Sequence, residues 1–216
     1  MSTAAIILAA GRSSRMGQEQ HKLLLPLGDR PVLAHVVDSV LASQARPIVV
    51  ALGYQAEQVR AILHPYTAQP EVVIIENHDY KQGMSTSLRK GIETLMASSP
   101  TVNGVLIVLG DQPLMPSHIF NTMIETKQAT EKRIIGALYH GKRGNPTLFD
   151  TSLFPELLEM TGDEGGRKVI ERHSQEMAML EMGDDIPNYD VDTWEAYQQV
   201  LAIWEQLGQK RNEKHP

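Results

Sequence analysis

The chain has 216 residues, of which 42% are hydrophobic and 21% charged, a composition typical of a globular protein rather than a disordered one. Its formal net charge of −6 argues against a general nucleic-acid or membrane-surface binder. The absence of cysteine excludes disulfides and cysteine nucleophiles, and without a membrane-length apolar run or a secretory signal we expect a cytoplasmic protein.

Short aliphatic runs alternate with helix-like segments over about the first 140 residues. The expected strands are residues 4–8, 48–52, 72–75, 105–109 and 134–138. The expected helices are residues 32–42, 56–63, 85–96 and 117–127. This alternation predicts an α/β fold with a mostly parallel sheet covered by helices on both faces. In such folds ligands bind at the carboxyl ends of the strands, so the loops there are the places to search.

The pattern changes after residue 139. The stretch "HGKRGNPTLF" predicts a basic loop that leads into a short strand, and "TSLFPELLEM" and "GGRKVIERH" predict short helices. A strand at 177–180 and a closing helix at 193–207 follow. We therefore expect one domain over residues 1–208 and a frayed polar tail at 209–216.

The first candidate site follows the first strand, in "ILAAGRSSRMG". Gly11 comes directly after the strand and Gly17 six positions later, a spacing that fits neither a P-loop nor a dinucleotide-binding fingerprint. Two interpretations stay open. The loop's N–H groups could cradle an anion, with Arg12, Arg15 and Lys22 within reach, or the loop could be a tight turn with solvated cations.

Carboxylates mark two further segments. In "VLGDQPLM", Asp111 ends an expected buried strand, where an unpaired carboxylate is costly. Mg²⁺ suits this position, because it typically takes one or two protein carboxylates and completes its shell with water and phosphate oxygens. Asp190 and Asp192 in "YDVDT" point to the same side of an extended segment and could bind the same ion. The alternative is that Asp111 and Asp192 cap a turn and a helix.

A hydroxyl-rich helix start lies in "NHDYKQGMSTSLRKGI", where Gly83 precedes Ser85, Thr86 and Ser87. Amides and hydroxyls at such a position could contact a nucleobase or a phosphate. Capping of the helix explains one of these hydroxyls but not a glycine and three hydroxyls together. The eight histidines form no close-spaced metal-binding set.

Taken in order, these motifs resemble the MobA-like nucleotidyltransferases. The segment "LAAGRSSRMG…KLLLPLGDRPVL" is similar to the signature of that family. The segments "GMSTSLRKGI", "GDQPLM", "GKRGNPTLF", "GDEGGRKVI" and "DVDT" resemble its molybdenum cofactor cytidylyltransferase (MocA-like) branch. The resemblance implies a Rossmann-like three-layer α/β/α fold, with a nucleotide-binding part to about residue 115 and an acceptor-binding part over about 116–208.

The resemblance also implies an activity. It implies a Mg²⁺-dependent enzyme, with Mn²⁺ as an alternative ion, that transfers CMP from CTP to molybdenum-molybdopterin and releases pyrophosphate. A molybdenum hydroxylase would receive the product, and no nucleic acid or membrane would be a partner. We expect a monomer, since no exposed heptad or long apolar stripe stands out in the sequence.

The resemblance assigns roles residue by residue. Asp111, Arg15 and Lys22 would be catalytic, and Asp111 and Asp192 would hold the metal. The nucleotide-binding residues would be Leu8, Ala9, Ala10, Gly11, Arg15, Lys22, Gly83, Ser85 and Ser87. The acceptor-binding residues would be Arg143, Gly144, Asn145, Asp163, Gly166 and Arg167.

Two departures from the family pattern leave alternatives open. The segment before Lys22 is slightly longer than usual, and Asn145 stands where cytidylyltransferases often have histidine. One alternative is a related nucleotidyltransferase that uses another NTP or a sugar or polyol phosphate acceptor. The other is a non-catalytic carrier that passes molybdenum cofactor to a hydroxylase. The presence of Asp111, Asp192, Arg15 and Lys22 together disfavours a carrier, which needs no metal site.

Overall fold

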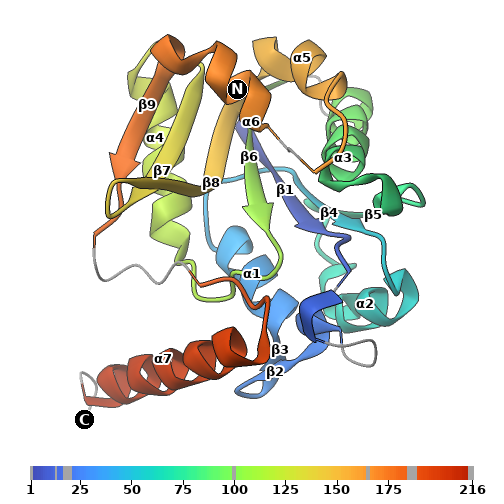
Figure 1. Cartoon of the computed structure of the whole chain (residues 1–216), viewed down its shortest axis with the longest axis vertical. Coiled ribbons are helices and arrows are strands. Elements are labelled where there is room, and N and C mark those ends of the chain that lie inside the picture. The colour runs from blue at the N-terminus through green and yellow to red at the C-terminus, as the bar shows by residue number, and fades with distance from the viewer. Residues whose placement is uncertain are drawn as a thin grey trace.

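The computed structural model describes residues 2–12, 14–16, 21–98, 101–163, 166–183 and 189–213. Its centre is a seven-stranded sheet in the order β5-β4-β1-β6-β8-β7-β9 (Figure 1). The strands are β1 (Ser2–Ala9), β4 (Ile48–Leu52), β5 (Val72–Glu76), β6 (Val102–Leu109), β7 (Ile134–Tyr139), β8 (Lys142–Asp150) and β9 (Met177–Glu181). Neighbouring strands are parallel except at β8, which is antiparallel to both β6 and β7. The mostly parallel α/β sheet predicted from the sequence is confirmed.

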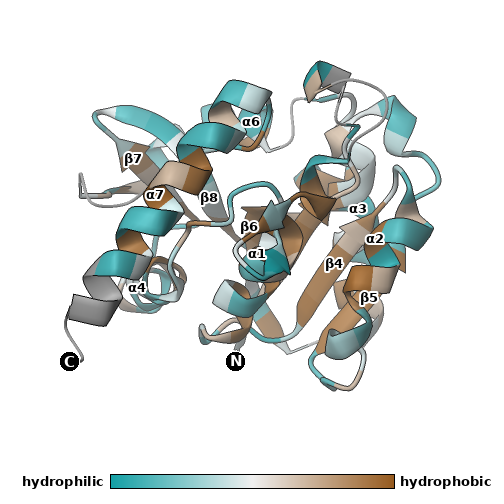
Figure 2. Ribbon diagram, turned by 90° about the horizontal axis from the view of Figure 1, so that it is seen from below, coloured by the Kyte–Doolittle hydropathy of each residue, from teal (hydrophilic) through white to brown (hydrophobic). Residues whose placement is uncertain are grey.

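Helices cover both faces of the sheet. The helices α1 (Val32–Leu41), α2 (Ala56–Ile62) and α4 (Ser117–Ala129) pack on one face, and α3 (Met84–Ser98), α5 (Phe154–Leu158) and α6 (Arg167–Arg172) pack on the other. Successive residues of a strand point to opposite faces of the sheet. Ile7 therefore packs in the hydrophobic core under α1, α2 and α4, and Ile6 packs in the core under α3, α5 and α6. Figure 2 shows the hydrophobic residues concentrated in β4, β5 and β6. Strand β4 and most of β6 are buried on both faces, whereas β5 at the edge of the sheet is only partly buried.

The segment after β7 differs from the prediction. The sequence predicts a basic loop at residues 140–145, whereas β7 and β8 form a hairpin in which Tyr139 pairs with Lys142. His140 and Gly141, with φ of 51° and 73°, make the two-residue turn, because left-handed residues at both positions match the twist of a hairpin. The glycine, asparagine and proline at 144–146 hide the strand from a propensity-based prediction.

The last helix, α7 (Trp194–Glu213), is longer than the predicted 193–207 and takes in most of the tail expected to fray. A single glycine inside a helix, here Gly208, costs only about 1 kcal/mol relative to alanine, and the glutamine, lysine and arginine after it are good helix formers. Residues 214–216 lie outside the described residues. The helix packs through Tyr197 and Val200 against a third, smaller core beside the short strands β2 (Pro26–Leu27) and β3 (Arg30–Pro31). None of the helices described here is long and apolar enough to cross a membrane.

Candidate functional site

A cleft of about 510 Å³ opens where β1 and β6 end. The chain leaves β1 toward β4 and β5 on one side and returns to β6 on the other, so the cleft lies at the point where the strand order reverses. Parallel pairing of Leu8 with Leu109 brings the loops after both strands to the same edge. The cleft is lined by Leu8, Ala9, Ala10, Gly11, Arg12, Arg15, Lys22, Leu23, Tyr80, Lys81, Gly83, Met84, Ser87, Leu109, Asp111, Asp163, Asp190 and Asp192.

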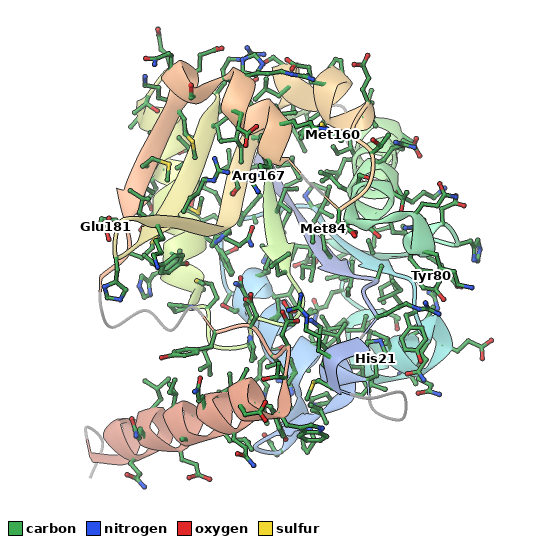
Figure 3. All side chains as sticks on the ribbon, in the orientation of Figure 1. His21, Tyr80, Met84, Met160, Arg167 and Glu181 are labelled. Carbon is green, nitrogen blue, oxygen red and sulfur yellow. The ribbon has the colours of Figure 1, made fainter. Side chains whose placement is uncertain are left out.

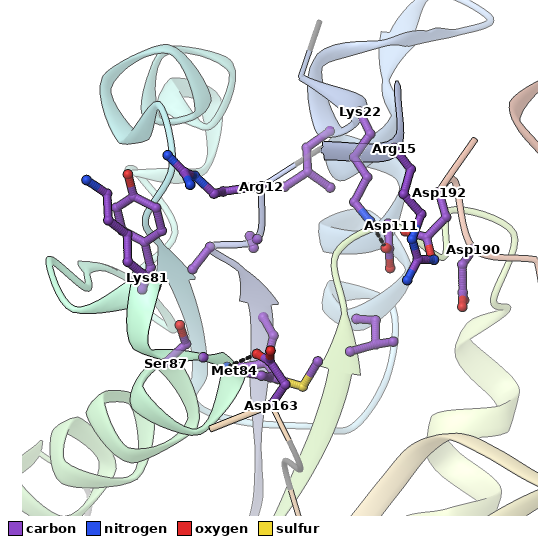
Figure 4. A pocket seen from close by; sticks show the side chains of 18 residues that line it. Arg12, Arg15, Lys22, Lys81, Met84, Ser87, Asp111, Asp163, Asp190 and Asp192 are labelled. Atoms are coloured by element: carbon purple, nitrogen blue, oxygen red, sulfur yellow. Dashed lines mark hydrogen bonds and ion pairs between the residues drawn. The ribbon is translucent and has the colours of Figure 1, made fainter. Parts of the chain in front are cut away.

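Two carboxylates and two cations meet at one end of this cleft (Figure 4). The Lys22 ammonium donates to Asp111 Oδ2 and, at 2.6 Å, to Asp192 Oδ1. The Arg15 guanidinium donates to the other oxygen of Asp192 at 2.9 Å. The backbone N–H of Val191 donates to the carbonyl of Asp111 at 3.0 Å and fixes the segment before α7 beside the end of β6. The structure therefore brings together the four residues that the sequence predicts as the catalytic and metal-binding set.

The charges in this cluster stabilise one another. Burial by itself would lower the pKa of the Lys22 ammonium, but the Asp111 and Asp192 carboxylates outweigh it and hold that pKa above its usual value. Burial raises the pKa of Asp192, yet Lys22 and Arg15 bring it below its usual value. Asp190 differs, because burial and the nearby charge of Asp111 raise its pKa. Of Asp190 and Asp192, Asp192 is therefore the one whose carboxylate the surrounding charges keep ionised.

The donor set fits a divalent cation such as Mg²⁺. The carboxylates of Asp111 and Asp192 already converge on one cationic atom, the Nζ of Lys22, so their oxygens face a common point. In the described part of the chain no three His, Asp or Glu side chains are arranged to hold an ion on their own. An ion with two carboxylate ligands and a shell completed by water and phosphate oxygens matches the ordinary coordination of Mg²⁺.

The opposite wall of the cleft carries Arg12, which the sequence places beside the anion loop, and Tyr80 and Lys81, which the sequence does not predict. Arg12 lies over the ring of Tyr54, 5.8 Å from its centroid, and Tyr54 stacks with His21 on one side and approaches Tyr80 on the other. Lys81 lines the same wall, across the cleft from Asp111 and Asp192 in Figure 4. The signal that could have found this wall is the "YKQG" stretch directly before the glycine turn.

The helix start at residues 83–87 is only partly as predicted. Gly83, with φ 111°, and Ser87 line the cleft, and the Ser87 hydroxyl accepts from the Asn77 side-chain amide at 2.9 Å. Ser85, predicted as a nucleotide-binding residue, lines neither cleft, because its side chain points away from the helix face of Met84 and Ser87 and is fully buried. The Thr86 hydroxyl bonds to the carbonyl of Gly83 and accepts from Asn77, so it stabilises the turn.

A second cleft of about 250 Å³ adjoins the first and shares four residues with it. Its lining is Leu8, Met84, Leu88, Ile107, Leu109, Arg143, Gly144, Asn145, Thr147, Phe149, Asp163, Gly166, Arg167 and Ile170. All six residues predicted for the acceptor line it, and they come from the β7–β8 hairpin, the loop after α5 and the start of α6. The predicted Gly17, residues 18–20 of the longer segment at 18–21 before Lys22, and residues 164–165 of the "GDEGGR" motif lie outside the described residues.

The chain is similar in sequence to proteins of a known family. Residues 5–177 match the family model described as the MobA-like NTP transferase domain. The purine catabolism protein PucB of Bacillus subtilis (strain 168) is 29% identical over 199 residues, which cover 90% of this chain and 94% of PucB. The bifunctional protein GlmU of Burkholderia mallei (strain SAVP1) is 34% identical over 139 residues, which cover 64% of this chain but only 26% of GlmU. The chain thus spans about a quarter of the length of that relative.

Solved structures of similar proteins share the whole fold. The crystal structure of Rv0371c from Mycobacterium tuberculosis H37Rv has a TM-score of 0.76 and 31% sequence identity, covering 94% of this chain and 99% of Rv0371c. A second structure of Rv0371c, in complex with manganese, has a TM-score of 0.73 and 30% identity over the same shares of both chains. The likeness therefore extends over nearly the whole length of both chains.

Proposed function

Because the chain belongs to the MobA-like NTP transferase domain family, we propose that it is a nucleotidyltransferase that transfers CMP from CTP to molybdenum-molybdopterin and releases pyrophosphate. The observation that carries this proposal is the convergence of Asp111 and Asp192 on one cationic position beside Arg15, at the edge where the strand order reverses. A second cleft adjoins that position, so two substrates can be held side by side.

CTP would occupy the larger cleft. Its triphosphate would lie along the loop after β1, where a Cβ on Gly11 would have no neighbour within 4 Å. The fold therefore does not require glycine there, and the missing side chain leaves the backbone open to phosphate oxygens. Arg15, whose side chain is 71% exposed, is free of the core and able to turn from Asp192 toward the pyrophosphate. The base would face the start of α3 at Gly83 and Ser87.

The reaction needs positioning and charge neutralisation rather than a protein nucleophile. A phosphate oxygen of the acceptor attacks the α-phosphorus of CTP, and the bond from that phosphorus to the bridging oxygen of pyrophosphate breaks. Arg15 and Lys22 would offset the charge of the departing pyrophosphate. Asp111 and Asp192 would hold the divalent ion, whose contribution is to stabilise negative charge on the phosphates. The manganese in Rv0371c supports a divalent ion in this family, and Mn²⁺ is the proposed alternative to Mg²⁺.

The smaller cleft would bind the acceptor. Leu88, Ile107, Phe149 and Ile170 give it an apolar floor, and arginines from β8 and α6 line it as well. This combination suits a flat, partly apolar molecule that carries a phosphate, such as a pterin cofactor. A sugar phosphate is less well matched to the apolar floor, because hydroxyls that lie against Leu88, Ile107, Phe149 and Ile170 would have no hydrogen-bond partners there. A molybdenum hydroxylase would then be the recipient of the product.

The decisive experiment measures pyrophosphate release from CTP, GTP, ATP and UTP, each with and without molybdenum cofactor and with and without Mg²⁺. We expect release from CTP only when both cofactor and metal are present. Release with a different nucleotide would correct the base preference. The complete absence of turnover under every condition would contradict the proposed enzyme and favour a cofactor carrier.

A further inference from the structure

The loop at residues 159–163, which follows α5 and leads into the smaller cleft, is bonded to the start of α3 in the larger cleft. The Asp163 carboxylate accepts from the backbone N–H of Met84 at 3.0 Å, and the carbonyl of Gly162 accepts from the N–H of Ser85 at 3.0 Å. These N–H groups belong to the first turn of a helix, where backbone N–H groups have no hydrogen-bond partners within the helix. The loop thus completes the hydrogen bonding of a helix start that walls the other cleft.

The contact between the two segments is also close in space. A Cβ on Gly83 would lie 2.4 Å from the backbone carbon of Gly162, so the two backbones touch with no room for a side chain. One turn further along α3, the Arg89 guanidinium donates to the carbonyls of Leu158 and Met160 at 2.9 and 2.7 Å. The loop is therefore held along α3 from Gly83 to Arg89.

Asp163 and Met84 lie at the junction of the two clefts. Both residues line the larger cleft and the smaller one. In Figure 3, Met84 lies between Arg167, which lines the smaller cleft, and Tyr80, which lines the larger one. Figure 4 shows the bond from Met84 to Asp163 on the side of the larger cleft that carries Ser87.

We propose that Asp163 is a positioning residue for the nucleotide: from the loop of the acceptor cleft, its carboxylate fixes the start of α3 against which the base of the bound nucleoside triphosphate lies. The sequence motif predicts Asp163 only as an acceptor contact. The inference rests on the proposed function, because it assigns the start of α3 to the base. Its consequence is that the two clefts are energetically coupled, since a ligand that orders one side of the Met84–Asp163 bond also orders the other.

The test compares two substitutions that remove the same charge. Asp163→Ala removes the acceptor for the Met84 N–H, whereas Asp163→Asn keeps an oxygen that can accept it. We expect Asp163→Ala to weaken CTP binding about tenfold and Asp163→Asn to retain most of the affinity. Inorganic tripolyphosphate has no base, so the two variants should bind it equally to within about twofold. Asp150→Ala is the matched control, because Asp150 caps the short helix at Thr151–Leu153 and lines neither cleft.

A second readout reports the coupling directly. In hydrogen–deuterium exchange, CTP should protect the backbone amides of residues 158–163 in the wild type and in Asp163→Asn, but not in Asp163→Ala. Equal CTP affinity of Asp163→Ala and the wild type would overturn the positioning role while leaving the proposed function intact. Equal loss of CTP and tripolyphosphate binding in Asp163→Ala would also overturn it, because the defect would then be general. A wild-type chain that binds neither ligand would contradict both the inference and the proposed function.

Discussion

Lys22 lies between two carboxylates that are far apart in the sequence. Its side chain is only 12% exposed and donates to both Asp111 and Asp192. The segment before Lys22 is therefore not too long for Lys22 to reach the cleft. Its ammonium lies where a divalent ion shared by the two carboxylates would lie, so the lysine and the ion compete for the same oxygens until a triphosphate offers Lys22 other partners.

This competition gives a prediction for metal binding. Lys22→Met should bind Mn²⁺ about tenfold more tightly than the wild type in the absence of nucleotide, because two neighbouring carboxylates would be left without their internal cation. Titration followed by electron paramagnetic resonance measures the free Mn²⁺ directly. Lys127→Met is the control, since it removes a lysine that pairs with Asp150 and lines neither cleft. Unchanged or weaker Mn²⁺ binding by Lys22→Met would contradict the shared position.

At the scale of elements, the turn that starts α3 depends on a glycine. Gly83 has φ 111°, a value that other residues rarely adopt, and its Cα packs on the backbone of Gly162. We expect Gly83→Ala to destabilise the protein by more than about 1 kcal/mol, which for a chain of this length lowers Tm by at least about 2–4 °C. Thermal unfolding measures the shift. Gly183→Ala should leave Tm unchanged, because no atom lies within 4 Å of its added Cβ and its φ is not positive; an equal loss in both variants would contradict the contact with Gly162.

Some of the strands can be predicted from the sequence alone and others cannot. Aliphatic strands such as β4 and β6 are predicted well, because strands buried on both faces are nearly continuous apolar runs. The first half of strand β8, "KRGNP", is missed because it has the composition of a loop and is held in the sheet by its pairing with β7. Local sequence carries the propensity of a segment but not the neighbour that pairs with it.

The residues of the candidate site likewise divide into those that the sequence predicts and those that it does not. Gly11, Arg15 and Asp111 are found from the sequence because they follow strand ends, where this fold places ligands. The burial of Ser85 depends on the angular position of one residue in the first turn of α3. The bond from Asp163 to Met84 joins segments that only the folded chain brings together, so no local motif predicts it.

For the molecule as a whole, one histidine links stability to pH. His173 bonds through its two ring nitrogens to Glu176 and Glu156, at 2.6 and 2.7 Å, and thereby ties the end of α6 to α5 and to the start of β9. These two carboxylates raise the pKa of His173 above its usual value of 6.5. A pKa that is higher in the folded state means that the stabilisation is complete below pH 6.5 and is lost as the pH rises through the raised value.

The expected result is a pH-dependent difference between wild type and His173→Gln. The wild type should exceed His173→Gln in Tm by more at pH 5.5 than at pH 9, since only protonated His173 gains from both carboxylates. Thermal unfolding of both proteins across this range is the measurement. His64→Gln serves as the control, because the His64 side chain lies on the short helix after α2, away from these glutamates. A difference in Tm that is constant with pH, or larger at pH 9, would contradict the assignment.

The whole molecule carries a net charge of −6, yet it would have to bring two polyanions together at one edge of its sheet. The larger cleft is lined by four cations, Arg12, Arg15, Lys22 and Lys81, and by four aspartates, so the positive charge of the cations offsets the carboxylates where the substrates would meet. A divalent ion between Asp111 and Asp192 would add to that charge. Catalysis would therefore depend on these two carboxylates holding the ion.

The most direct test is pyrophosphate release from CTP in the presence of molybdenum cofactor and Mg²⁺, measured for the wild type and for Asp111→Asn. The substitution is nearly isosteric, so unchanged circular dichroism and a single cooperative thermal transition should show that the fold is retained. We predict a loss of Mg²⁺-dependent release of about 100-fold or more, because the amide cannot supply the negative charge that holds the ion. Release at the wild-type rate by the folded Asp111→Asn variant would contradict the account.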